Sequence, residues 1–140
     1  MAITQAICNS FKLEILQGKH TTVHEYKIAL YTSLAAMDEN TASYAVTNEI
    51  AAAGGYSAGG STLAGANATI VNNVAILDFT DVNYTTASFS ARGALIYNNT
   101  LAGKNAVCVI DFGADYAAVN GAFQVQFPAP TSALAMIRIK

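Results

Sequence analysis

The sequence predicts a mainly β fold: an antiparallel β-sandwich, jelly roll or barrel with one short N-terminal helix. Short apolar runs with the two-residue period of strands recur from residue 26 to the end of the chain. Gly and Asn pairs, which favour turns, separate these runs. The four-residue apolar period of a helix occurs only before Gly18. So many short strands are too many for one open sheet, which favours a sandwich or barrel.

Length and composition narrow the class of protein further. The chain has 140 residues, which we expect to form one domain over 1–140, with 1–25 as an N-terminal helix or arm. Charged residues make up 11% and hydrophobic residues 53%, so we expect a partner or further copies of the chain to cover part of the apolar surface. The net charge of −2 lacks the basic footprint of nucleic-acid-binding proteins.

Neither membrane insertion nor export is indicated. No apolar run approaches the roughly 18–20 residues of a membrane span, and the first residues lack the pattern of a signal peptide. We therefore expect a protein made in a cytosol, with no membrane or nucleic-acid partner. Cys8 and Cys108 lie far apart in no motif, which favours two small buried thiols over a disulfide.

The N-terminal segment is the predicted helix. Its apolar residues recur every four positions, at Ile3, Ile7, Phe11 and Ile15. This period predicts a helix over 4–17, capped by Thr4 and ended by Gly18. The alternation of Phe11, Leu13 and Ile15 with polar residues is equally compatible with a strand. Residues 19–25, which include both histidines, are predicted to form a polar turn.

Strands are predicted from residue 26 onward. The alternation of apolar and other residues over 26–31 indicates a half-buried strand. The remaining predicted strands are 44–49, 61–63, 68–71, 74–79, 85–91, 94–97, 106–112, 122–127 and 134–139. Asn120-Gly121 is the strongest hairpin signal, because both residues tolerate a positive φ. Residues 51–65 gather glycines around Tyr56, and they form either a flexible linker or an ordered loop that inserts Tyr56 into a neighbouring molecule.

Residue types that carry catalysis become rare along the chain. Nine of the sixteen Asp, Glu, Lys and Arg residues lie from Glu49 onward, and both histidines precede it. An active site normally groups titratable residues in a cleft. The sequence therefore predicts no catalytic residue and no cofactor, and it favours a structural or binding protein over an enzyme.

Two groups of residues have a spacing that a metal site could use. His20 and His24, followed by Glu25, are spaced for a helix but lie in a predicted turn. Solvated loop histidines are the favoured interpretation. The acidic pairs Asp78 with Asp81 and Asp111 with Asp115 lack a calcium-loop motif, so we expect turn-capping or ion-pairing carboxylates.

Arg92 interrupts an apolar run. An isolated buried charge costs several kcal/mol or more, so we expect Arg92 to face solvent or to form an ion pair with one of Asp78, Asp81 and Asp111. A structural ion pair is favoured over a catalytic arginine. The neighbouring Gly93 is expected to mark a bulge or bend.

Several runs of the sequence resemble one family of virion proteins. They are YKIALYTS (26–33), TNEIAAAGGYSAGGSTLAG (47–65), ILDFTDVNYTTASFSARGALIYNNT (76–100), AVCVIDFGAD (106–115) and GAFQVQFP (121–128). Together they are similar to the capsid cement, or decoration, proteins of tailed phages of the Bordetella phage type. The resemblance extends over about 11–139, and ARGALIYN and DFG are its more distinctive parts.

This resemblance implies a jelly-roll-like β-sandwich without catalytic, metal or cofactor sites. Such a protein is made in the host cytoplasm and binds the exterior of an icosahedral head in the virion. There it acts as a homodimer that bridges neighbouring major capsid protein subunits. For the partner contact we predict the side chains of Phe11, Leu13, Ile15 and Tyr56.

Three alternatives stay open. A tail or fibre component belongs to the same class of protein. A carbohydrate-binding, adhesive β-sandwich is a second, although the chain has no Trp and its sequence shows no clustered aromatic platform. An enzyme of cupin type is a third, and it would need metal ligands on strands. The two histidines of the chain, His20 and His24, precede the first predicted strand.

Overall fold

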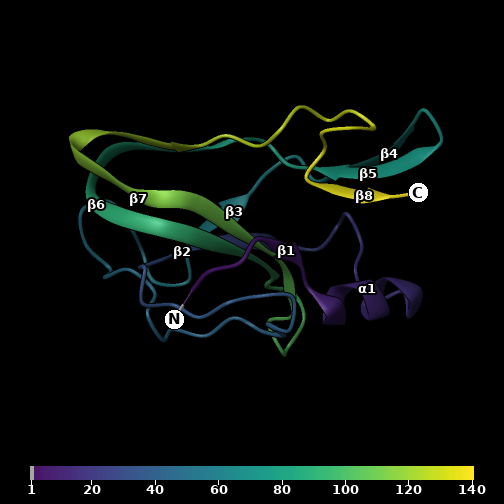
Figure 1. Cartoon of the computed structure of the whole chain (residues 1–140), viewed down its shortest axis with the longest axis horizontal. Coiled ribbons are helices and arrows are strands. Elements are labelled where there is room, and N and C mark those ends of the chain that lie inside the picture. The colour runs from purple at the N-terminus through teal and green to yellow at the C-terminus, as the bar shows by residue number, and fades with distance from the viewer. Residues whose placement is uncertain (1) are drawn as a thin grey trace.

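The computed structural model describes residues 2–140 and contains antiparallel sheets with one short helix (Figure 1). Strand makes up 47% of the chain and helix 6%, which confirms the predicted mainly β class. The arrangement of the sheets is consistent with a β-sandwich. The jelly-roll connectivity stays a prediction.

The strands form two sheets. The first has five strands in the spatial order β1 (Ala6–Ile7), β7 (Ala106–Val125), β6 (Val82–Asn98), β2 (Tyr26–Tyr31) and β3 (Ser61–Leu63). The second has three, in the order β4 (Asn67–Val71), β5 (Val74–Asp78) and β8 (Ile137–Ile139). The helix α1 (Asn9–Leu16) packs near β7. Strands β3, β4 and β5 lie within one residue of their predicted bounds, whereas β8 is shorter than the predicted 134–139.

The long strands β6 and β7 dominate the fold. They replace four separate predicted strands, 85–91, 94–97, 106–112 and 122–127. Their pairing continues through Gly93, and the register shifts there, where a bulge or bend was predicted. The predicted hairpin at Asn120-Gly121 is wrong, because Asn120 lies inside β7. Its φ of 49° coincides with another register shift, so the positive φ serves a bulge instead of a turn. A hairpin with two positive φ values is found at Asn72-Asn73, between β4 and β5.

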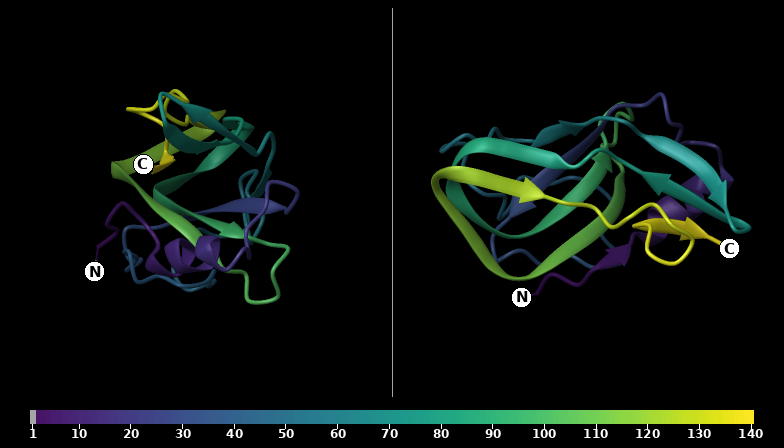
Figure 2. Two further views of the ribbon diagram at one scale, coloured as in Figure 1. Left: turned by 90° about the vertical axis from the view of Figure 1, so that its right-hand side faces the viewer. Right: turned by 90° about the horizontal axis from the view of Figure 1, so that it is seen from above.

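Both long strands curve back over themselves. Figures 1 and 2 show the yellow-green C-terminal half of β7 lying above its green first half. The register explains the bend: Ala91 pairs with Tyr116 and Gly93 pairs with Asp111, so β7 has extra residues at this point. One ribbon thereby contributes to two layers, and the buried side chains gather between them.

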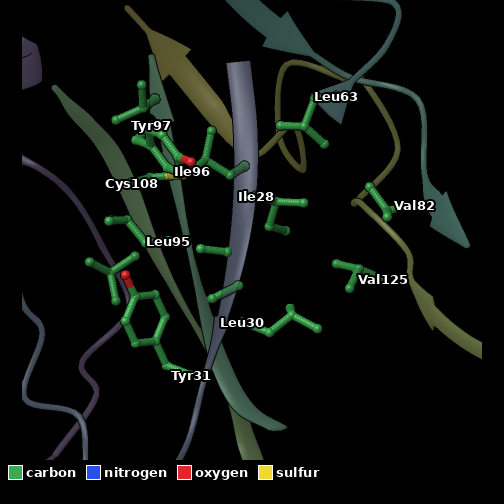
Figure 3. Close-up of a cluster of buried hydrophobic side chains, with 14 of the residues drawn as sticks. Ile28, Leu30, Tyr31, Leu63, Val82, Leu95, Ile96, Tyr97, Cys108 and Val125 are labelled. Atoms are coloured by element: carbon green, nitrogen blue, oxygen red, sulfur yellow. The ribbon is translucent and has the colours of Figure 1, made fainter. Parts of the chain in front are cut away.

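The core surrounds β2, which is buried on both faces instead of half-buried as predicted. On one face, Ile28 and Leu30 lie near Val82 and Val125 of the opposite layer (Figure 3). On the other, the loop over residues 43–59 covers the strand. There the Tyr31 hydroxyl donates a hydrogen bond to the carbonyl oxygen of Ala45 at 2.6 Å. The period-two pattern located the strand but could not show that a loop covers its second face.

The predicted strand at 44–49 is absent. Only isolated bridges occur at its ends, where Ser43 pairs with Asn105 and Glu49 with Tyr31. Asn48 has a φ of 64°, which interrupts extended backbone inside the segment. The segment therefore forms the loop that covers β2.

The predicted helix over 4–17 is shorter than expected. Cys8 is the N-cap in place of Thr4, because residues 6 and 7 pair with β7. The C-terminal end agrees with the prediction: Gly18 has a φ of 70°, and its N–H donates to the Ile15 carbonyl at 3.0 Å. Phe11 and Glu14 form the buried face of the helix.

Candidate functional site

Both histidines converge on Asn98, the fully buried last residue of β6. The Asn98 Nδ2 atom lies 3.1 Å from Nδ1 of His20 and 2.9 Å from Nδ1 of His24. Its Oδ1 atom accepts the Thr100 N–H at 3.0 Å, which fixes the orientation of the amide. An amide NH₂ only donates, so each histidine accepts through Nδ1 and carries its proton on Nε2.

Glu14 completes this histidine network. Its Oε2 atom lies 3.3 Å from Nε2 of His20 and accepts a hydrogen bond from Asn105. Burial lowers the pKa of His20, and this effect outweighs the opposing influence of Glu14. The His20 side chain is only 3% exposed, so the prediction of solvated histidines is wrong for this residue.

The histidine network is a structural junction. The Asn98 amide lies between the two Nδ1 atoms, so these two atoms cannot hold an ion between them. Glu25, the third residue of the candidate metal group, instead accepts a hydrogen bond from Asn99. Within residues 2–140, no group of three or more His, Cys, Asp or Glu side chains is arranged to hold a metal ion.

The predicted ion pair of Arg92 is confirmed, with Asp111 as the partner at 3.2 Å. The Gly113 N–H, which donates to Asp111 at 2.9 Å, lowers the pKa of this carboxyl, and Arg92 lowers it further. Asp81 accepts the N–H of Phe127 at 2.8 Å. Asp111 thus has both the turn-capping and the ion-pairing role that the sequence predicted, whereas Asp81 joins two segments that lie 46 positions apart.

Both cysteines are buried free thiols, as expected. Burial raises the pKa of the Cys8 thiol to about 11 and also raises that of Cys108. A thiol with a raised pKa stays protonated and is a poor nucleophile at neutral pH. Both side chains therefore act as small apolar residues of the core.

Of the four predicted partner residues, two belong to the protein's own core. Phe11 is 2% exposed and Tyr56 is 4% exposed, so both side chains are buried within the chain itself. Ile15 is partly buried against the same core. Leu13 is 57% exposed on the outer side of α1, and its role as a contact stays a prediction.

Tyr56 anchors the glycine-rich loop to the molecule's own sheet. Its hydroxyl donates to Glu49 Oε1 at 2.6 Å and accepts the Leu30 N–H at 2.9 Å. The same carboxylate accepts the Gly59 N–H at 2.7 Å and the Tyr44 hydroxyl at 2.6 Å. The loop is ordered, and it inserts Tyr56 into its own chain instead of a neighbouring molecule.

A groove between the two halves of β7 is the candidate binding site. Its volume of about 690 Å³ lies within the range of roughly 300–1,000 Å³ usual for ligand sites. The walls come from both halves of β7 and from the C-terminal segment, and they include Ile110, Phe112, Tyr116, Phe123, Phe127, Leu134 and Met136. Polar groups at the groove are chiefly the amides of Gln5, Gln124 and Gln126. Among the described residues, Arg138 is the single charged residue of the groove.

The sequence did not reveal this groove. Phe112 and Tyr116 have ring centroids 6.5 Å apart, and Phe112 lies 6.4 Å from Phe123. The bend in β7 brings these rings together, so the absence of an aromatic cluster, inferred from the sequence, is corrected. The extra residues at 112–115 are the physical cause of this bend. In the sequence, the run DFGAD (111–115) resembled an ordinary strand end. The clustered rings offer apolar faces to a ligand, and the glutamine amides offer hydrogen-bond donors and acceptors.

Comparisons with protein-family models, curated proteins and solved structures found no match to this chain. Residues 2–140 include no helix with the length and apolar character needed to cross a membrane.

Proposed function

We propose that this protein is a virion structural protein that binds the outer surface of an icosahedral phage head and cements neighbouring major capsid protein subunits. The observation that carries the proposal is the groove along β7, which is lined by aromatic and aliphatic side chains, by glutamine amides and, among the described residues, by one charged side chain. Such a surface is suited to holding another protein by shape and backbone contacts. The resemblance of residues 11–139 to tailed-phage decoration proteins supplies the identity of the partner.

The contacts that the titratable side chains make within the chain also support a binding role. His20 and Glu14 are buried against each other, and Asp111 is paired with Arg92. Glu49 is held by two tyrosine hydroxyls and a backbone N–H. These groups stabilise loops and strand ends of the chain itself. The proposed binding role requires no catalytic residue and no cofactor.

The proposed mechanism is thermodynamic linkage. A protein that binds the assembled shell, but not its separated subunits, adds its binding free energy to the stability of the shell. A homodimer that holds two subunits at once would bind far more tightly than either contact alone, since the second contact becomes intramolecular. Cementing thus requires no chemical step.

Binding to heads tests this function directly. Heads of the phage that encodes the chain would be stripped of the protein, mixed with the purified chain and sedimented. We expect saturable binding and added density on the outside of the shell in electron micrographs. Unassembled major capsid protein serves as the control and should bind much less. Failure to bind assembled heads would contradict the proposal.

Glycan binding by an adhesive β-sandwich is a second candidate, and one observation favours it. Tyr116 is 55% exposed beside Phe112 at the groove, and glutamine amides stand nearby. Aromatic faces and amides are the groups that sugars contact in many sites. A glycan array with the wild-type protein and Tyr116→Ala separates the two candidates. Sugar binding that Tyr116→Ala removes would favour the adhesive function.

A further inference from the structure

One side of the β7 C-terminal half has no strand partner. Residues 116–125 pair with β6 along one edge. On the other edge, β1 pairs only with Cys108 and Val109, and within residues 2–140 no strand continues the sheet beside 116–125. An unpaired edge presents a row of backbone N–H and C=O groups that another extended chain can bind.

The direction of these backbone groups follows from one hydrogen bond. The Phe127 N–H, two residues beyond the end of β7, donates to Asp81, the residue that precedes β6. Successive residues of an extended strand alternate in direction, so the N–H groups of Gln124 and Gln126 point away from β6. Lys, Arg and Pro, which commonly protect natural edges, do not occur in 116–125.

The groove lies next to this edge and between the layers of the molecule. A strand added along β7 would place every second side chain into the groove, against rings such as Phe112, Phe123 and Phe127. Apolar side chains at those positions would therefore complete the packing between the layers. The intervening side chains would face solvent and are free to be polar.

Arg138 identifies a further feature of the occupant. Its guanidinium donates to the carbonyl oxygens of Ser132 and Ala133. In the part of the chain that the structure describes, no carboxylate forms an ion pair with it, and no acidic side chain lines the groove. A carboxylate on the occupant would complement this single positive charge.

We propose that β7 binds an extended segment of a partner protein by β-strand addition. The segment has apolar side chains at alternate positions and a carboxylate that pairs with Arg138. Main-chain hydrogen bonds to the edge supply affinity, and the groove and Arg138 supply specificity. This inference rests on the proposed function only for the identity of the partner, which would be a shell subunit.

Peptide probes test the inference without phage heads. The probe is a short acetylated peptide of alternating Val and Thr that ends in an Asp amide, and its neutral counterpart ends in an Asn amide. A third peptide ends in Val with a free C-terminal carboxylate. Titration calorimetry should show that the Asp probe binds wild-type protein about tenfold more tightly than the Asn probe, the usual effect of a charge-assisted hydrogen bond.

Comparison of the Asp probe with the third peptide shows whether the carboxylate is a side chain or a chain end. Arg138→Gln should remove the preference for acidic probes, while Lys104→Gln, which changes a distant cation, should keep it. Equal preference in Arg138→Gln and wild type would overturn the role of Arg138. No binding of any probe would overturn the site.

Hydrogen exchange on the wild-type protein provides a second readout that needs no variant. Strand addition should slow exchange at the amides of Gln124 and Gln126 when the Asp probe is bound. Binding without such protection would contradict strand addition. Head binding is measured separately, so loss of the proposed function and loss of this inference give different results.

Discussion

Replacement of Tyr56 by Phe removes one oxygen atom from the centre of the loop network. That hydroxyl donates to Glu49 at 2.6 Å and accepts the Leu30 N–H at 2.9 Å. Phe retains the ring, which packs 5.9 Å from Phe89 and 6.2 Å from Tyr84. The change therefore tests the polar contacts alone, with the apolar packing kept.

The expected loss of stability follows from these two contacts. A buried N–H left without a partner costs about 1–3 kcal/mol, and a hydrogen bond to a charged group contributes about 1.5–3 kcal/mol. Glu49 keeps the Tyr44 and Gly59 donors, so the two losses do not add fully. We expect Tyr56→Phe to lower the free energy of unfolding by about 2–4 kcal/mol.

Urea unfolding at pH 7, followed by far-UV circular dichroism, measures this change, since the chain has no Trp. With a slope of about 2 kcal/mol/M, the midpoint should fall by about 1–2 M. Tyr116→Phe is the matched control, because Tyr116 is exposed on β7 and should change stability by less than about 0.5 kcal/mol. Equal stability of wild type and Tyr56→Phe would refute the anchoring role of this hydroxyl.

Three further predictions concern pH, packing and salt. His20 has a folded-state pKa below its ordinary 6.5, so the unfolded chain binds the proton at a higher pH than the folded chain does. The contribution of His20 to stability should therefore be complete above about pH 6.5 and decrease below it. Urea midpoints measured between pH 7 and 5 should depend less on pH in His20→Gln than in wild type. An Ala side chain at Gly60, where φ is +85°, would overlap the Ile28 carbonyl. Gly60→Ala should therefore lower the free energy of unfolding, measured with heat or urea, by more than about 3 kcal/mol, whereas the unobstructed Gly18→Ala should lower it by about 1 kcal/mol. Similar losses for the two variants would contradict the loop packing. Because the groove has one charge, attachment to heads should survive high salt in sedimentation, and release there would indicate an ionic interface instead.

Local signals in the sequence predicted the elements that depend on neighbouring residues. The double Asn at 72–73 predicted its turn because both residues tolerate a positive φ. Gly18 marked the end of the helix for the same reason. The alternation over 26–31 located β2. Each of these features is specified within a few residues of the chain.

The errors arose where distant segments decide the structure. Asn120-Gly121 has the chemistry of a turn, yet the pairing of β7 with β6 on both sides of it converts the positive φ into a bulge. His20 lies in a polar segment, but its partner Asn98 is 78 positions away, so its burial could not be inferred. Thr4 could cap a helix, but pairing of residues 6 and 7 with β7 delays the helix to Asn9.

The candidate site was the least predictable part. Among the predicted contact residues, Phe11 and Tyr56 are large and apolar, which suits a core as well as an interface. The groove depends on the bend of β7, which brings Phe112 close to Phe123. No sequence period signals such a bend. The sequence did predict a surface with few charges, and the groove has that character.

The resistance of heads to rupture tests the cement function most directly. Heads carrying the protein, heads stripped of it and stripped heads to which it is added back would be heated, or diluted out of concentrated salt, while DNA release is followed with a dye. We predict that stripped heads stay assembled but rupture at a lower temperature and a milder osmotic shock, and that added protein restores the original thresholds. Equal thresholds for stripped and decorated heads would contradict the cement function.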